Sequence, residues 1–110
     1  MSTVGIFILD SNFGVRWVSP ALERYFGLPR HEIIGMNKRD LIRERIKNLF
    51  EEPEHFAEKV LATYDNNTYV EKFECHVLPQ GDREERWLEH LGHPIKSGPY
   101  AGGRIEFYTD

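Results

Sequence analysis

The chain has 110 residues and a net charge of −4 at pH 7, with 40% hydrophobic and 13% aromatic residues. This composition predicts one domain with a single packed core and excludes a disordered chain. The scattered basic residues argue against a nucleic-acid-binding surface, and the single cysteine, Cys75, excludes an internal disulfide and a cysteine-based zinc site. The longest apolar run, residues 6–9, is too short to cross a membrane, and we see no signal peptide. We therefore expect a cytoplasmic protein without membrane contact.

Two strands and a helix are predicted at the start of the chain. Residues 4–10 are apolar without alternation, which is typical of a strand buried on both faces. Residues 11–18 supply a turn and a second strand, so the two strands should form a hairpin. Ser19 and Pro20 then indicate a helix start, with Ser19 as the cap, and Gly27 indicates its end.

A block of helices follows this hairpin. Residues 29–34 favour a short helical turn, and Asp40 is the predicted cap of a third helix. Residues 38–47 carry a mixed-charge face that we expect to be solvated. Pro53 predicts the start of a longer helix that continues to Tyr64.

Three strands complete the pattern. Residues 69–78 alternate cleanly, with Phe73 and Cys75 expected to face inward. Residues 86–95 and 104–109 flank a loop rich in Gly and Pro and predict a long hairpin. Helices segregated beside an antiparallel sheet indicate the α+β class.

The last strand is expected to have one buried face and one wet face. Ile105 and Phe107 are assigned to the core, and Arg104 and Glu106 to solvent. The sequence stops at Asp110 directly after a strand. We therefore expect a module excised from a longer protein.

The order of these motifs resembles a PAS sensor domain over essentially the whole length, residues 1–110. The resemblance rests on segments in family order: residues 5–10 and 14–21, 26–28 and 32–35, 86–88 and 94–95, and 103–110. It implies a five-stranded antiparallel sheet with short helices packed on one face and a cavity between the two layers. It also implies a sensor or input module of a signalling protein such as a histidine kinase, with output through Thr109 and Asp110.

A ligand in that cavity would contact residues on its inner walls. The candidates are Phe26, Ile46, Phe56, Val60, Phe73, His90 and His93. His90 and His93 lie on opposite faces of one strand, so which of them faces the cavity depends on whether Trp87 points inward.

The sequence does not favour haem or flavin, and it leaves the cofactor unknown. Haem in related domains is held by a histidine on the long helix, but His55 points away from that helix's apolar face. Light-sensing relatives use a cysteine in the helical block, whereas Cys75 stands in a strand and should behave as a small hydrophobe. His31 and His76 show no partner pattern and are expected at the surface. We expect no metal site and, since catalytic motifs are missing, no enzyme.

Two functions remain open at this stage. The first is a sensor that binds a small ligand or a partner. The second is a ligand-free dimerisation module whose large apolar residues fill the core. In that case a homodimer would form through the outer sheet face, with Trp87 or Leu88 and Tyr108 as anchors.

Overall fold

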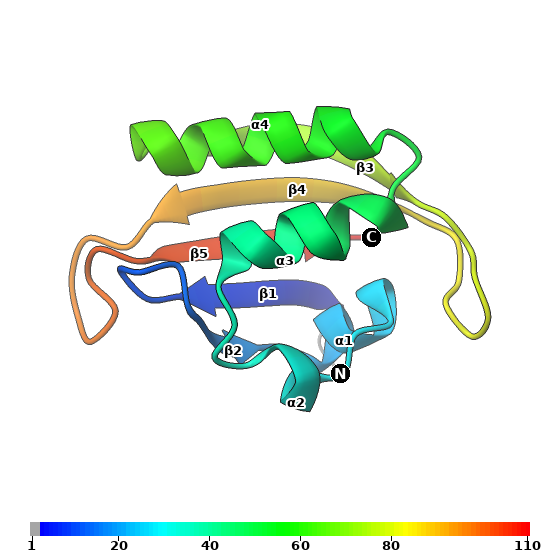
Figure 1. Cartoon of the computed structure of the whole chain (residues 1–110), viewed down its shortest axis with the longest axis horizontal. Helices are drawn as coiled ribbons and strands as arrows, with labels where there is room; N and C mark the ends of the chain where they lie inside the picture. The colour runs from blue at the N-terminus through cyan, green and yellow to red at the C-terminus, as the bar shows by residue number, and fades with distance from the viewer. Residues whose placement is uncertain (1–2) are drawn as a thin grey trace.

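A five-stranded antiparallel sheet in the order β2-β1-β5-β4-β3 forms one layer of the computed structural model, which describes residues 3–110 (Figure 1). The strands are β1 (Val4–Leu9), β2 (Val15–Val18), β3 (Val70–Val77), β4 (Arg86–Pro94) and β5 (Arg104–Thr109). The last strand, β5, is central and pairs with β1, so that Ile6 lies opposite Phe107. The predicted five-stranded α+β fold is confirmed.

Helices pack on one face of this sheet. They are α1 (Pro20–Phe26), α2 (Arg30–Ile33), α3 (Lys38–Glu44), the 3-10 helix η1 (Ile46–Leu49) and α4 (Pro53–Asn66). In Figure 1, α4 runs lengthwise in front of β3 and alongside β4, while α3 lies in front of the centre of the sheet. Leu41, Ile42 and Val60 from these helices are fully buried in the core between the layers.

Strand β1 is buried on one face only. Phe7 and Leu9 are fully buried, whereas Ile6 and Ile8 on the other face are half-buried. The prediction of a strand covered on both faces was wrong, because the helices cover only one side of the antiparallel sheet.

Strand β5 alternates as predicted, but its two faces are exchanged. Arg104 and Glu106 face the core and are at most 1% exposed, whereas Ile105 and Phe107 are half-buried on the outer face. The prediction of solvent-facing charges was wrong. Tyr108, a predicted interface anchor, is also fully buried on the inner face. The charged residues are tolerated inside because each finds polar partners there, as described below.

Strands β3 and β4 resolve the question of the two histidines. Cys75 is buried as predicted and Phe73 is half-buried. On β4, Trp87 is 52% exposed and points outward, so His90 on the opposite face is fully buried. His93 shares the outer face with Trp87. Leu88, the other proposed anchor on this strand, is fully buried.

The first helix begins and ends where the sequence predicted, but its cap differs. Gly27 ends α1 with a φ of 65°, in the left-handed region. Ser19 precedes the helix without capping it. Its hydroxyl accepts from the N–H of Ile6 and donates to the carbonyl of Val4, both at 2.9 Å, and so ties α1 to β1.

The third helix begins earlier than predicted. Asn37 caps it, because its Oδ1 accepts from the N–H groups of Arg39 and Asp40 at 2.9 and 3.2 Å. Asp40 lies within the first turn, so its prediction as the cap was wrong. The shift places Lys38 at the first position of α3, where its side chain is buried.

Candidate functional site

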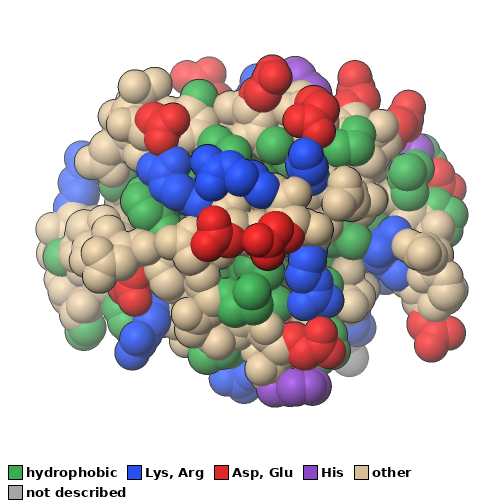
Figure 2. Space-filling model, in the orientation of Figure 1, with side chains coloured by type: hydrophobic (Ala, Val, Ile, Leu, Met, Phe, Trp, Pro, Cys, Tyr) green, Lys and Arg blue, Asp and Glu red, His purple; other side chains and the backbone are tan. Residues whose placement is uncertain are grey.

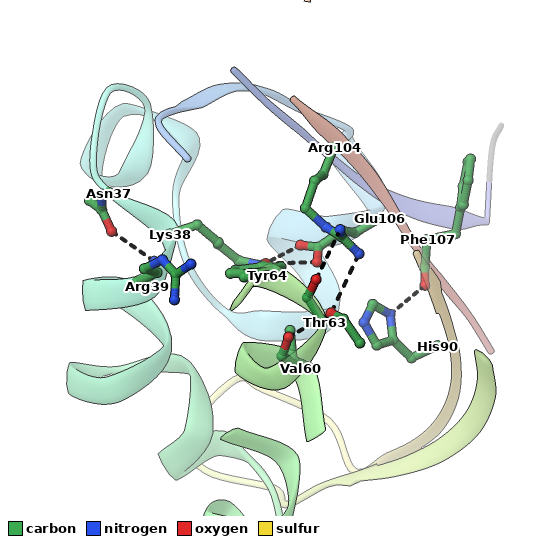
Figure 3. A network of polar contacts seen from close by, with 10 residues as sticks. All are labelled: Asn37, Lys38, Arg39, Val60, Thr63, Tyr64, His90, Arg104, Glu106 and Phe107. Carbon is green, nitrogen blue, oxygen red and sulfur yellow. Dashed lines mark hydrogen bonds and ion pairs between the residues drawn. The ribbon is translucent and has the colours of Figure 1, made fainter. Parts of the chain in front are cut away.

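Charged and phenolic side chains meet in the interior between α3, α4 and β5 (Figure 3). Lys38 Nζ lies 2.6 Å from Glu106 Oε1, and Tyr64 OH donates a 2.7 Å hydrogen bond to Glu106 Oε2. Lys38 Nζ also lies 3.3 Å from Tyr64 OH and 4.0 Å from the centre of the Phe7 ring. Both side chains of the ion pair are fully buried. The prediction that the charges of residues 38–47 are simply solvated was therefore wrong for Lys38.

Arg104 extends this network from the start of β5. Its guanidinium donates to the carbonyl of Thr68 at 2.7 Å and contacts the carbonyl and hydroxyl of Thr63 at 3.4 Å. It also lies 5.1 Å from the centre of the Tyr64 ring. Since Thr63 and Tyr64 belong to the last turns of α4, polar bonds tie β5 to that helix as well as to α3.

Burial and pairing together set the charges in this network. Burial disfavours the ionised form of Glu106 and is the largest influence, but the charges of Lys38 and His90 and the hydrogen bonds from Lys38 and Tyr64 together outweigh it and hold the pKa of Glu106 below its usual value. Burial lowers the pKa of Lys38, and Glu106 opposes part of that shift. Burial and the neighbouring Glu106 raise the pKa of Tyr64 well above its ordinary value, so the hydroxyl remains a donor. The network is a buried carboxylate satisfied by an ammonium and a phenol.

His90 lies beside this network with one unused nitrogen. Its Nδ1 is 2.9 Å from the carbonyl oxygen of Phe107, which can only accept, so Nδ1 carries the proton and Nε2 the lone pair. Burial lowers the pKa of His90 to about 4, which keeps the ring neutral at pH 7. The ring stacks on Tyr108 at 4.0 Å between centroids. Among residues 3–110, neither His90 Nε2 nor Tyr108 OH has a hydrogen-bond partner.

Most of the predicted cavity residues lie in the interior, packed against aromatic rings. At most 2% of each of the following is exposed: Phe26, Ile46, Phe56, Val60 and His90. Phe56 and Phe73 lie 6.2 and 5.5 Å from the His90 ring, which brings these three together. Phe26 lies 4.9 Å from the Tyr108 ring. His93 is apart from them, on the outer face, 6.0 Å from the Phe107 ring.

Sequence reasoning missed the polar part of this interior. One signal was available in the sequence. Tyr108 stands two residues after Glu106, so this large aromatic residue and Glu106 must lie on the same face of the strand. Lys38 offered no comparable signal, because its carboxylate partner is 68 residues away.

A surface pocket of about 180 Å³ lies where the start of α4 meets the edge strand β3. His76 stands beside it with Nδ1 bonded to Glu51 and with Nε2 2.6 Å from Glu85. The imidazole stacks on Trp87 at 4.3 Å between centroids. Hydrogen bonds to Glu51 and then Glu85 raise the pKa of His76. The prediction that His76 lacks partners was therefore wrong.

A family model described as PAS fold matches residues 2–110. The chain belongs to the PAS fold family. This PAS domain gave no match in a search of curated proteins. It is similar in structure to the PAS domain of a protein from Colwellia psychrerythraea, at 19% identity and a TM-score of 0.62, with 99% of this chain and 86% of that chain covered.

Two further solved structures come from histidine kinases. One is a domain of a sensory box sensor histidine kinase/response regulator from Geobacter sulfurreducens, at 19% identity and a TM-score of 0.63, covering 99% of this chain and 84% of that chain. The other is the LOV domain of a blue-light activated histidine kinase from Erythrobacter litoralis, at 17% identity and a TM-score of 0.66, covering 100% and 97%. These likenesses, at 17 to 19% identity, show that the chain shares the fold of these domains.

Two side chains of this PAS domain were considered for cofactor attachment, His55 and Cys75. His55 is exposed on α4, as predicted. Cys75 is a buried residue of β3, and burial raises the pKa of its thiol to about 12, which suits a small hydrophobe better than a reactive thiolate. Within residues 3–110, no group of three or more potential metal ligands is found.

The end of β5 is held by its neighbours on both sides. Thr109 pairs with Val4 of β1 and with Glu89 of β4. Asp110 accepts a 2.6 Å hydrogen bond from the guanidinium of Arg86.

Across the described part of the chain, no helix has the length and apolar character that crossing a membrane requires.

Proposed function

We propose that this PAS domain is the input module of a signal-transduction protein such as a histidine kinase. It senses a small ligand or a partner and passes a conformational change out through β5, where Thr109 and Asp110 form the exit. Family membership and the fold shared with kinase sensor domains support this proposal. The observation that carries it is the buried network that bonds Lys38 of α3 and Tyr64 of α4 to Glu106 of β5.

The network would transmit a change because its buried ion pair cannot be stretched by small steps without a large loss of stability. A buried ion pair is strongly destabilised when one partner moves away, since the other charge is then left without compensation. A stimulus that displaces α3 or α4 must therefore move β5 as well, or exchange one set of polar partners for another. A ligand or partner that prefers one of two such arrangements would shift their populations by its difference in affinity.

We infer a cytoplasmic location for this module. Its one cysteine, Cys75, is buried and unpaired, so the fold needs no oxidising compartment. PAS domains are sensory rather than catalytic modules, and we assign any enzymatic activity to other parts of the signalling protein.

The test is a chimera in which this domain, joined at Asp110, replaces the PAS domain of a histidine kinase. Glu106→Gln and Tyr64→Phe change the network with little change in shape. We expect each to alter the autophosphorylation rate about fivefold or more, the scale of ordinary coupling between sites. Lys47→Met, which removes an ion pair with the exposed Glu54, is the control and should leave the rate unchanged. Equal rates for all four proteins would contradict transmission through β5.

A second candidate function is a ligand-free dimerisation module, favoured by two observations. Aromatic rings occupy the interior around Phe26, Tyr108 and Phe50. The outer sheet face exposes Trp17, Trp87 and Leu91 by 37 to 52%. Exposed aromatic and aliphatic side chains of this kind are common anchors of protein interfaces.

Sedimentation tests this second candidate. A homodimer through the outer face should dissociate when Trp87 is changed to Glu, whereas Ile34→Glu, at an exposed apolar residue directly after α2, should have no effect. A wild-type protein that remains monomeric at high concentration would contradict it.

A further inference from the structure

The pocket beside β3 combines aromatic walls with carboxylates. Phe50 and Phe56 are almost fully buried and stack on each other at 4.2 Å between centroids, and Phe73 continues this wall. Toward solvent, the pocket is lined by Trp87, which is 52% exposed, and by acidic residues that include Glu52 and Glu74.

The carboxylates of Glu52 and Glu74 are uncompensated. His76 already pairs with Glu51 and Glu85. Among residues 3–110, no cation forms an ion pair with Glu52 or Glu74, and both are exposed. Two free negative charges beside aromatic rings attract a cation and repel an anion.

A neighbouring lysine shows that one of these rings accepts a cation. Lys59 Nζ lies 5.0 Å from the centre of the Phe73 ring, within the range of a cation–π contact. The pocket's volume of about 180 Å³ equals roughly six water molecules at about 30 Å³ each. It would hold a molecule of about six to ten non-hydrogen atoms at ordinary packing.

We propose that this pocket binds a small organic cation with an apolar body, of the arylalkylamine class. The ammonium group would lie near Glu52 and Glu74, and the apolar body would pack against Phe73 and Trp87. Neither α3 nor the buried ion pair lines this pocket, so the site is distinct from the interior network.

The wall of the pocket also reaches the output strand. Phe56 and Phe73 both contact the ring of His90, which bonds to Phe107 and stacks on Tyr108. His90 Nε2 has no donor, so nothing but ring packing fixes that edge of the imidazole. A ligand that moves Phe73 would thereby move β5, and this consequence rests on the proposed function, whereas binding itself does not.

The test is a titration of the domain with phenethylammonium chloride, followed by backbone amide NMR shifts and by tryptophan fluorescence. We expect saturable shifts in residues 50–56 and 73–76 with a dissociation constant on the order of 1 mM, as a few exposed contacts give. Phenylacetate, which has the same ring and the opposite charge, should cause no such shifts.

Variants with matched controls test whether the carboxylates of Glu52 and Glu74 bind the ammonium group. Glu52→Gln combined with Glu74→Gln should weaken binding about fivefold. Glu58→Gln combined with Glu71→Gln, at exposed positions of α4 and β3 outside the pocket, should not change it. Lys59→Gln removes the competing ammonium and should tighten binding about threefold. These changes are at exposed positions, and unchanged thermal unfolding will verify that each variant is folded.

Three results would overturn the proposal: equal shifts with phenylacetate, equal affinity of the Glu52/Glu74 variant and its control, or no shift with phenethylammonium up to about 20 mM. If the amine binds as expected but leaves autophosphorylation of the kinase chimera unchanged, the pocket stands and coupling to the output strand fails.

Discussion

The ion pair between Lys38 and Glu106 places two opposite charges where water reaches neither of them. Removing one partner leaves the other charge buried without compensation, which typically costs about 3–5 kcal/mol. We expect Lys38→Met to lower the free energy of unfolding by this amount, measured by urea denaturation at neutral pH. Changing Glu106 to Leu in addition should recover most of the loss, because no uncompensated charge then remains.

Lys47 is the matched control for this residue. It forms an ion pair of nearly the same length, 2.7 Å, but its partner Glu54 is 73% exposed. Lys47→Met should therefore change the free energy of unfolding by less than about 1 kcal/mol. A loss for Lys38→Met as small as this would show that the charge of Glu106 is compensated from elsewhere.

At the scale of secondary-structure elements, the start of α3 offers two possible N-cap residues, Asn37 and Asp40. Asn37 bonds to two free N–H groups of the first turn, whereas Asp40 accepts none of them. We expect Asn37→Ala to lower the free energy of unfolding by about 1 kcal/mol and Asp40→Ala by less than about 0.5 kcal/mol. Chemical denaturation of both variants checks this order, and the reverse order would restore Asp40 as the cap.

The connection from β4 to β5 requires a residue without a side chain at its end. A Cβ atom on Gly103 would lie 1.9 Å from the carbonyl oxygen of Leu9, so backbone atoms must move to admit it. We expect Gly103→Ala to destabilise the domain by at least about 3 kcal/mol in chemical denaturation. Ser97→Ala, at an exposed position of the same loop, should stay within about 0.5 kcal/mol. Equal effects of the two changes would rule out this close approach.

At the scale of the whole molecule, the order and type of elements could be predicted from the sequence because local patterns determine them. Alternation in residues 69–78 and the turn residue Gly27 depend only on neighbouring residues. The inner face of β5 was mispredicted because Arg104 and Glu106 carry charge, and charge predicts solvent unless a partner is known. That partner, Lys38, lies on another element, and no local pattern reveals it. The role of His76 depends in the same way on Glu51 and Glu85, which the fold brings together.

The pH dependence of folding should carry opposite contributions from two histidines. His90 has a pKa of about 4 in the folded protein against 6.5 for an unperturbed side chain. The unfolded chain therefore binds the proton first, and stability is lost as pH falls from 6.5 to 4, by about 3 kcal/mol in total. The pKa of His76 is instead raised by Glu51 and Glu85, so its stabilisation is present below 6.5 and is lost as pH rises through the folded value.

Urea denaturation across this pH range separates the two contributions. His90→Leu should flatten the fall in stability between pH 6.5 and 4 relative to wild type, while the part due to Glu106 remains, because its lowered pKa removes stability only toward the acid end. His76→Gln should leave that fall unchanged and remove a decline above pH 6.5. If His90→Leu lost stability in acid as steeply as wild type, His90 would bind its proton over the same pH range in the folded and the unfolded protein. Its Nε2 would then accept a proton as readily as in water, which contradicts a lone pair held in a dry part of the core.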